Sequence, residues 1–158
     1  MRGAGYKQYE ISNFAKSGKE SQHNITYWKN EDYYGFGAGA HGYVGRKRHI
    51  NIKGVNPYNE AASKGLPRLE QFEVPREEAM EDFMMVGLRM LDGMESSRFL
   101  KQFGVSVEEI FAAPLKKMMD LELIERRGDL EGYRLSEKGI LFGNDVFGEF
   151  IGYLTIEA

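Results

Sequence analysis

Residues 23–28 have the clearest capacity for chemistry, because His23 is followed at short spacing by two aromatic side chains, Tyr27 and Trp28. An imidazole nitrogen can ligate iron, and aromatic rings offer faces on which a flat ligand can stack. A glycine-rich run at residues 35–41 follows, and glycine lets another group approach the backbone closely. Together these features predict a site for a flat, iron-bearing or phosphate-like ligand. The structural alternative for His23 is a loop histidine that bonds a nearby backbone group.

The glycines alone carry little information about a ligand. Gly35, Gly37 and Gly39 alternate, whereas the dinucleotide fingerprint requires G-x-G-x-x-G between a strand and a helix. Alternate glycines equally suit close packing of a neighbouring element. His41 and His49 flank one expected hairpin and can converge on a metal. No carboxylate pair accompanies them, so ordinary strand residues are the commoner outcome of this pattern.

Composition restricts the class of protein. The chain has 158 residues, 42% of them hydrophobic and 13% aromatic, as in a soluble globular protein of one domain or slightly more. A net charge of -3 argues weakly against a general nucleic-acid binder. The chain has no cysteine, so it supplies no disulfide, no thiolate zinc site and no cysteine-held iron-sulfur cluster. Without a long apolar run or a signal-like start, we expect a soluble, cytoplasmic protein.

Turn residues divide the chain near residue 66, where Gly65 and Pro67 interrupt the pattern. We therefore expect two domains, residues 1–66 and residues 67–158. The first contains all three histidines and the only tryptophan, and the second shows helical periodicity. The elements expected in the first are a strand over 9–14, helical turns over 30–36, a hairpin of 40–44 with 48–52, and a short helix from Pro57 to Ser63.

The second domain is expected to be mainly helical. An apolar face predicts a helix over 75–91, and a second short helix ends at a left-handed Gly104. A capping box at Ser106 opens a third helix, which Pro114 either kinks or restarts. The remaining elements are a two-stranded wing of residues 124–127 and 132–135, and a last helix capped by Ser136 with Ile140, Phe147 and Ile151 facing inward. This order is typical of a winged-helix-like module.

A winged helix can bind DNA, but the charges on this one nearly cancel. The candidate recognition helix contains Lys116 and Lys117 together with Asp120 and Glu122, and the wing alternates arginines with acidic residues. Binding to phosphates requires a net basic surface. A packing or docking role is therefore favoured over nucleic-acid binding.

Several ordered blocks resemble one family. Residues 9–15 (YEISNFA), 23–28 (HNITYW) and 34–41 (YGFGAGAH), followed by the helical module, are similar to the oxygen-independent coproporphyrinogen III oxidase-like group of radical S-adenosylmethionine proteins, in its heme-chaperone branch. The resemblance implies an α+β fold. A remnant of the edge of a partial β/α barrel, made of short strands and a hairpin, is followed by a mainly helical, winged-helix-like carboxy-terminal domain.

The same resemblance places the family's redox centre outside this chain. In the family, a Cys-x-x-x-Cys-x-x-Cys motif near the amino terminus binds a 4Fe-4S cluster whose open iron binds S-adenosylmethionine. This chain resembles only the last part of the family's length and has none of those cysteines. We therefore expect it to be inactive as an enzyme by itself and assign it no catalytic residue.

The residues that the resemblance singles out concern heme and S-adenosylmethionine. The His-Asn-x-x-Tyr-Trp motif is associated with heme binding in the chaperone branch, which makes His23 the expected iron ligand. Tyr27 and Trp28 are then expected to pack on the porphyrin, with Asn24 part of the same motif. The residues expected near S-adenosylmethionine in the intact parent are Gly37, Gly39 and Ala40.

The function implied is heme binding and transfer to an acceptor hemoprotein. Two alternatives stay open: an oxygen-independent coproporphyrinogen III oxidase, and a winged-helix nucleic-acid or protein interaction module. A barrel that is cut open leaves strand edges unpaired, and such edges recruit partners. We therefore expect self-association through strands of residues 8–15 or 40–52.

Overall fold

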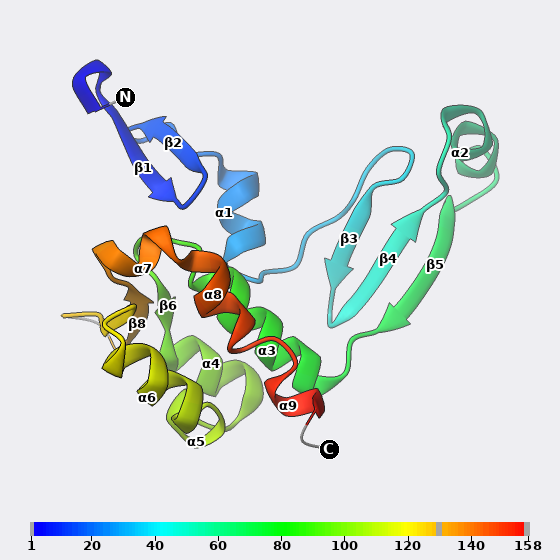
Figure 1. The fold of residues 1–158 in the computed structure, drawn as a ribbon. Coiled ribbons are helices and arrows are strands. Elements are labelled where there is room, and N and C mark those ends of the chain that lie inside the picture. Colours follow the sequence, from blue (N-terminus) through cyan, green and yellow to red (C-terminus); the bar gives the residue numbers. More distant parts are fainter. Residues whose placement is uncertain (1, 129–130, 157–158) are drawn as a thin grey trace.

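The computed structural model describes residues 2–128 and 131–156, and it combines helices with strands in an α+β arrangement (Figure 1). A helical body lies at one end, and a three-stranded sheet with its own short helix extends from it at the other. The amino-terminal hairpin and one short helix lie against the helical body. Within the described ranges, none of the helices has both the length and the apolar character that crossing a bilayer requires.

The amino-terminal segment forms a hairpin. After a short 3-10 helix, η1 (Arg2–Ala4), strand β1 (Tyr6–Glu10) pairs antiparallel with β2 (Asn13–Lys16). The single strand expected over 9–14 is therefore wrong, because the chain turns in the middle of that block. The carboxylate of Glu10 holds the turn by accepting hydrogen bonds from the backbone N–H of Ser12, at 2.9 Å, and from the side chain of Asn13.

Helix α1 (Gln22–Trp28) contains the histidine motif, and Ser21 caps it by accepting a hydrogen bond from the backbone N–H of Asn24. The helical turns expected over 30–36 are wrong. Asn30 has φ 53°, a left-handed conformation that asparagine tolerates better than most residues, so it follows the end of α1 and starts no new helix. The chain then runs extended as far as the glycine run.

The extended sheet contains β3 (His41–Val44), β4 (Lys47–Asn51) and β5 (Arg68–Glu73), with α2 (Val55–Ala62) between the last two. The predicted hairpin is confirmed, and its turn residues Gly45 and Arg46 both have positive φ, as a two-residue hairpin loop of this kind requires. The short helix is confirmed and starts two residues before Pro57. Strand β5 was not expected, and it places residues 68–73 in one sheet with residues before the predicted boundary at 66.

The strand order β3-β4-β5 determines which edges are open. Strand β4 is central, and Tyr33 exchanges two backbone hydrogen bonds with Tyr43 on the outer side of β3. Self-association through strands of residues 40–52 stays a prediction; within the described residues β4 is paired on both sides, and the outer edge of β3 is bridged only at Tyr43. The open edge of this sheet is β5, whose residues are exposed along its whole length.

The helical body closely follows its prediction. Gly104 is left-handed with φ 73°, and the capping box at Ser106 is present. The helix restarts just before Pro114, since one helix ends at Ile110 and the next begins at Ala112. The elements are α3 (Arg76–Gly87), β6 (Met94–Glu95), α4 (Ser96–Phe103), α5 (Val107–Ile110), α6 (Ala112–Asp120), β7 (Ile124–Arg126), β8 (Gly132–Leu135), α7 (Glu137–Leu141), α8 (Gly143–Gly148) and α9 (Tyr153–Ile156).

Two details of this body differ from expectation. The expected pair of strands, β7 and β8, gains β6, which pairs with β8 to give the order β6-β8-β7. The Gly128-Asp129 turn expected between β7 and β8 lies partly outside the described residues. The single last helix is replaced by α7, α8 and α9. Glycines, which disfavour helix interiors, recur in this segment, and Gly152 has a left-handed φ of 78°. Phe147 is buried and Ile140 half-buried as predicted, but Ile151 is exposed.

Aromatic side chains form the centre of the helical body. Phe99 is fully buried and contacts three other rings, with centroids 5.4 Å from Phe83, 4.7 Å from Phe103 and 6.1 Å from Phe111. A buried carboxylate lies close to this core. Glu81 on α3 accepts hydrogen bonds from the backbone N–H groups of residues 152, 154 and 155 at 2.9, 2.7 and 3.3 Å, and thereby holds the start of α9.

Candidate functional site

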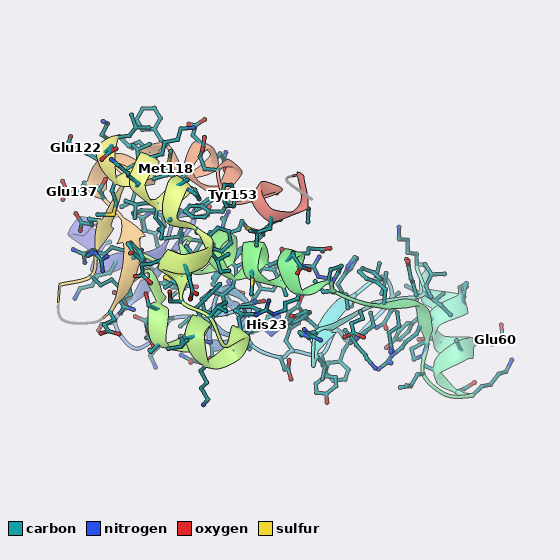
Figure 2. All side chains as sticks on the ribbon, turned by 90° about the horizontal axis from the view of Figure 1, so that it is seen from below. His23, Glu60, Met118, Glu122, Glu137 and Tyr153 are labelled. Carbon is teal, nitrogen blue, oxygen red and sulfur yellow. The ribbon has the colours of Figure 1, made fainter. Side chains whose placement is uncertain are left out.

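A cleft of about 380 Å³ lies where α1, β3 and α3 meet. Its walls include Tyr27 from α1, His41 and Tyr43 from β3, and Met85 on α3. Figure 2 shows His23 at the junction between the helical body and the sheet, whereas Glu60 on α2 marks the far end of the sheet. The histidine motif is thus brought to the same junction as the end of the glycine run.

His23 and Tyr27 lie on one side of α1 because residues four apart are neighbours on a helix surface. Both approach Tyr33, which lines the cleft. The ring centroid of His23 lies 6.3 Å from that of Tyr33 with the planes nearly perpendicular, and the centroid of Tyr27 lies 5.4 Å from it. The imidazole is solvent-exposed at the rim of the cleft. The structure therefore brings together the expected iron ligand and one of the two expected porphyrin-packing residues.

Trp28 lies edge-on to Tyr27, with ring centroids 4.7 Å apart, but it is not among the residues that line the cleft. The guanidinium carbon of Arg89 lies 4.4 Å from the centre of the Trp28 ring, and Arg89 is paired with Glu10 at 2.7 Å. Asn24 also points away from the cleft, with its side chain 3.5 Å from the side-chain oxygen of Asn13. Both motif residues thereby attach α1 to the hairpin and the helical body. Packing of Trp28 on a porphyrin stays a prediction.

One wall of the cleft contains an ion pair. Arg48 on β4 pairs with Asp82 on α3, and its other terminal nitrogen lies 3.7 Å from Glu78. Burial raises the pKa of the Asp82 carboxyl, and the Arg48 guanidinium acts in the opposite direction. The pair joins the sheet to the helical body at the wall of the cleft.

Burial raises the pKa of two tyrosines that line the cleft, Tyr33 and Tyr43. Burial is the largest cause of the raised pKa of Tyr33, and the neighbouring Tyr27 adds to it. Burial likewise raises the pKa of Tyr43, followed by the charge of Asp82. A neutral phenol offers an apolar ring face together with one hydrogen-bond donor. The cleft therefore combines aromatic ring faces with the polar groups of Asn30, Arg48 and Asp82.

Residues 35–40 of the glycine run lie against β4 and α2, outside the residues that line this cleft, whereas His41 at its end lines it. Gly37 and Gly39 have φ values of 103° and 69°, which explains why glycine is needed there. The N–H of Gly37 donates to the hydroxyl of Tyr58, and that of Gly39 donates to the carbonyl of Ile52. The N–H of Ala40 donates to the carbonyl of Gly37. These groups therefore maintain the turn, and their contact with S-adenosylmethionine stays a prediction.

The other two histidines are separated by the pleat of the sheet. His41 pairs with Ile50, and Gly42 with His49, so the two imidazoles point to opposite faces. His49 is buried with its ring against Gly42, where a β-carbon would collide with it. Burial lowers the pKa of His49, followed by the charge of Arg68. Convergence of His41 and His49 on one metal is therefore wrong.

The side-chain donor atoms of this chain fit heme iron, but they do not fit a 4Fe-4S cluster. Within the part of the chain that the structure describes, no three His, Cys, Asp or Glu side chains gather where they can hold a metal ion. Heme iron needs only one or two protein ligands, because the porphyrin supplies the other four. An exposed imidazole beside the rings of Tyr27 and Tyr33 fits that requirement. A 4Fe-4S cluster does not fit, since the chain contains no cysteine.

Sequence reasoning missed the polar contacts that hold the site together. The pair of Arg48 with Asp82 joins residues 34 apart, and the pair of Arg89 with Glu10 joins residues 79 apart. One local signal was present, since the adjacent Glu81 and Asp82 interrupt an otherwise apolar stretch of α3. Glu10 lies inside the YEISNFA block, but the pattern does not indicate its partner.

The comparisons with known proteins agree on one family. Residues 74–142 match the HemN C-terminal domain family. The chain is 45% identical over 155 residues to the heme chaperone HemW of Bacillus subtilis, covering 98% of this chain and 40% of that protein. It is 36% identical over 147 residues to the heme chaperone HemW of Lactococcus lactis, covering 93% of this chain and 38% of the relative. The chain thus spans about two fifths of the length of these relatives.

The fold agrees with a solved structure. Coproporphyrinogen III oxidase (HemN) from Escherichia coli, described as a radical SAM enzyme, matches 96% of this chain and 38% of its own with a TM-score of 0.67 and 18% identity. At this identity the match concerns the fold, and it shows that the mixed helix and strand arrangement is HemN-like. The chain therefore belongs to the oxygen-independent coproporphyrinogen III oxidase-like family of radical S-adenosylmethionine proteins, in the branch of its heme-chaperone relatives.

Proposed function

We propose that this chain takes part in binding heme and delivering it to acceptor hemoproteins, with His23 as an iron ligand. The observation that carries the proposal is the placement of His23 and Tyr27 together beside Tyr33, at the rim of an aromatic cleft. The names of the two HemW relatives support the chaperone role over the oxidase alternative.

The size and openness of the site suit transfer of a ligand. A cleft of about 380 Å³ is near the lower end of the ~300–1,000 Å³ range of ligand pockets. A porphyrin held by one edge keeps the rest of its surface accessible, which delivery to another protein requires. The iron ligand is exposed on a short helix, where a competing ligand can approach it.

We also propose that the helical module is winged-helix-like and docks proteins rather than nucleic acid. Helices α4 to α6 precede the β7–β8 hairpin, in the order that such a module has. Two lysines on α6 are already paired with acids, Lys116 with Asp120 and Lys117 with Glu149, both at 2.6 Å. Paired charges contribute little to phosphate binding. An acceptor hemoprotein is the partner that fits the proposed function.

We propose that the β3-β4-β5 sheet and the β1–β2 hairpin are the remnant of the edge of a β/α barrel. In the intact protein, Gly37, Gly39 and Ala40 would then lie near S-adenosylmethionine. The left-handed turn at these residues leaves Gly37 without side-chain bulk on its outer side, which supports close approach of a cofactor. Because β5 pairs with β4, we place the division between the two domains after Glu73 rather than after residue 66. In this proposal a 4Fe-4S cluster and its radical chemistry require cysteines that this chain does not supply.

Replacing His23 with alanine is expected to weaken hemin binding at least about tenfold, because the iron loses its nitrogen ligand. The measurement is a titration of the chain with hemin, followed by the shift of the Soret band. Gln22→Ala is the matched control, since Gln22 is exposed on the same helix but has no imidazole to bind iron. Titration curves and spectra that are identical for His23→Ala and the unmodified chain would exclude His23 as a ligand.

We expect the chain to self-associate through the open edge of β5. Every residue of that strand is exposed, and its apolar side chains Leu69 and Phe72 lie in solvent. A lysine on an edge strand opposes pairing with another strand. Sedimentation velocity over a range of concentrations should therefore show an oligomer that Leu69→Lys dissociates. A sedimentation coefficient that stays that of a monomer at every concentration would contradict the expectation.

A further inference from the structure

We infer that His41 supplies the second histidine ligand to a heme iron held by His23. The inference rests on the proposed function and adds the side chain that completes the coordination of the iron. A porphyrin leaves two axial positions on its iron, and a protein fills one or both of them. The chain has three histidines, so a second imidazole ligand comes from His41 or His49.

The register of the sheet separates these two candidates. His41, Tyr43 and Arg48 share one face, because Tyr43 pairs with Arg48 and His41 lies two residues before Tyr43 on the same strand. All three line the cleft next to Tyr27. His49 points to the other face, where it lines a different hollow with Tyr34 and Phe36. His41 is therefore the histidine that faces the cleft.

Two different elements supply the imidazoles of this cleft. His23 is on α1, one helical turn before the lining residue Tyr27, and His41 is on β3 at the start of the strand. Tyr33 joins the two elements, since its ring lies 6.3 Å from that of His23 and its backbone bonds Tyr43 on β3. His41 lines the cleft, and His23 lies beside the lining residue Tyr33, so a flat ligand between α1 and β3 has an exposed imidazole on each of these two elements within its surroundings.

The exposure of His41 is consistent with a ligand role. Its side chain is solvent-exposed, whereas His49 is buried against Gly42 and its pKa is lowered by burial. An exposed imidazole keeps a ring nitrogen free for iron without breaking a contact of the fold. His41→Ala is therefore expected to leave the fold intact, which far-UV circular dichroism and the thermal midpoint will check.

The experiment compares hemin complexes of the unmodified chain, His23→Ala, His41→Ala and the double variant. Optical and electron paramagnetic resonance spectra should show six-coordinate, low-spin iron in the unmodified chain. Each single variant should give five-coordinate, high-spin iron and about tenfold weaker binding, and the double variant should not bind hemin stoichiometrically. Added imidazole should restore the low-spin spectrum of His41→Ala. His49→Gln is the matched control and should match the unmodified chain.

The outcomes separate this inference from the proposed function. The inference is overturned if His41→Ala keeps the low-spin spectrum of the unmodified chain while His23→Ala changes it. In that case heme binding through His23 still stands. A high-spin spectrum for His49→Gln also overturns it, because the second ligand then lies on the other face of the sheet. If the unmodified chain does not bind hemin, both proposals fail together.

Discussion

Arg89→Ala is expected to lower the free energy of unfolding by about 3 kcal/mol, because it leaves the buried carboxylate of Glu10 without its cation. Glu10 is 0% exposed and Arg89 retains 21% exposure of its side chain, which places the effect at the lower end of the range for broken buried pairs. The guanidinium also lies between the rings of Trp28 and Phe147, at 4.4 and 5.6 Å from their centres. Chemical denaturation measures the loss.

Two further variants show whether the unpaired charge is the cause. Glu10→Gln combined with Arg89→Ala should recover about 1 kcal/mol or more, because the buried charge is removed while an amide oxygen can still accept a hydrogen bond at the turn. Arg46→Ala is the matched control. Arg46 and Glu73 form an exposed pair at 45% and 59% exposure, so the loss should stay below about 1 kcal/mol. Equal losses for Arg46→Ala and Arg89→Ala would show that the buried pair has no special role.

The same variant has a consequence for α1. Arg89 stacks on Trp28, and Glu10 bonds the side chain of Asn13, which in turn reaches Asn24. The YEISNFA block therefore fastens the histidine helix to the helical body through contacts between side chains. In Arg89→Ala, we expect α1 to open locally before the helical core unfolds. Faster hydrogen exchange of the backbone amides of residues 22–28 would measure this opening.

Phe99→Ala is expected to cost about 4 kcal/mol, the largest single loss that we predict in the helical body. Phe99 is fully buried, and its edge and tilted contacts with Phe83, Phe103 and Phe111 join α3, α4 and the break between α5 and α6. Removal of the ring leaves a cavity that α3, α4, α5 and α6 cannot close by small movements. Denaturant unfolding followed by circular dichroism measures the cost.

Phe36→Ala is the control for this experiment. Phe36 is 84% exposed next to the glycine run, so its replacement should change the stability by less than about 0.5 kcal/mol. A loss for Phe99→Ala as small as that for Phe36→Ala would mean that the aromatic cluster does not form the centre of the core.

Local signals predicted the helical body well. The capping box at Ser106 and the left-handed Gly104 depend on residues within one turn, so the sequence contains the whole signal. The hairpin of β3 and β4 is similar, because Gly45 and Arg46 alone determine its turn. Helix α1 was missed because it is one of the short helices without a buried residue, so no apolar face indicates it.

Contacts between residues far apart in the sequence could not be predicted from the sequence pattern. Strand β5 has no alternation of buried and exposed positions, since all six of its residues are exposed, and only its pairing with β4 identifies it. For the candidate site, the residues 23–28 and His41 could be singled out from their types. Their common cleft could not, because it depends on the contacts of Tyr33 and on the pair of Arg48 with Asp82.

The buried carboxylate of Glu81 gives the end of the described chain an unusual importance. Glu81 and Asp82 are adjacent on α3, the first bound to the backbone at residues 152–155 and the second to Arg48 in the cleft wall. Displacement of residues 152–155 would remove the backbone N–H donors of the Glu81 carboxylate. Glu81 is adjacent to Asp82, which lies in the wall of the cleft. A fusion or a truncation that displaces residues 152–155 is therefore expected to disturb α3 next to the Arg48–Asp82 pair, at the wall of the cleft.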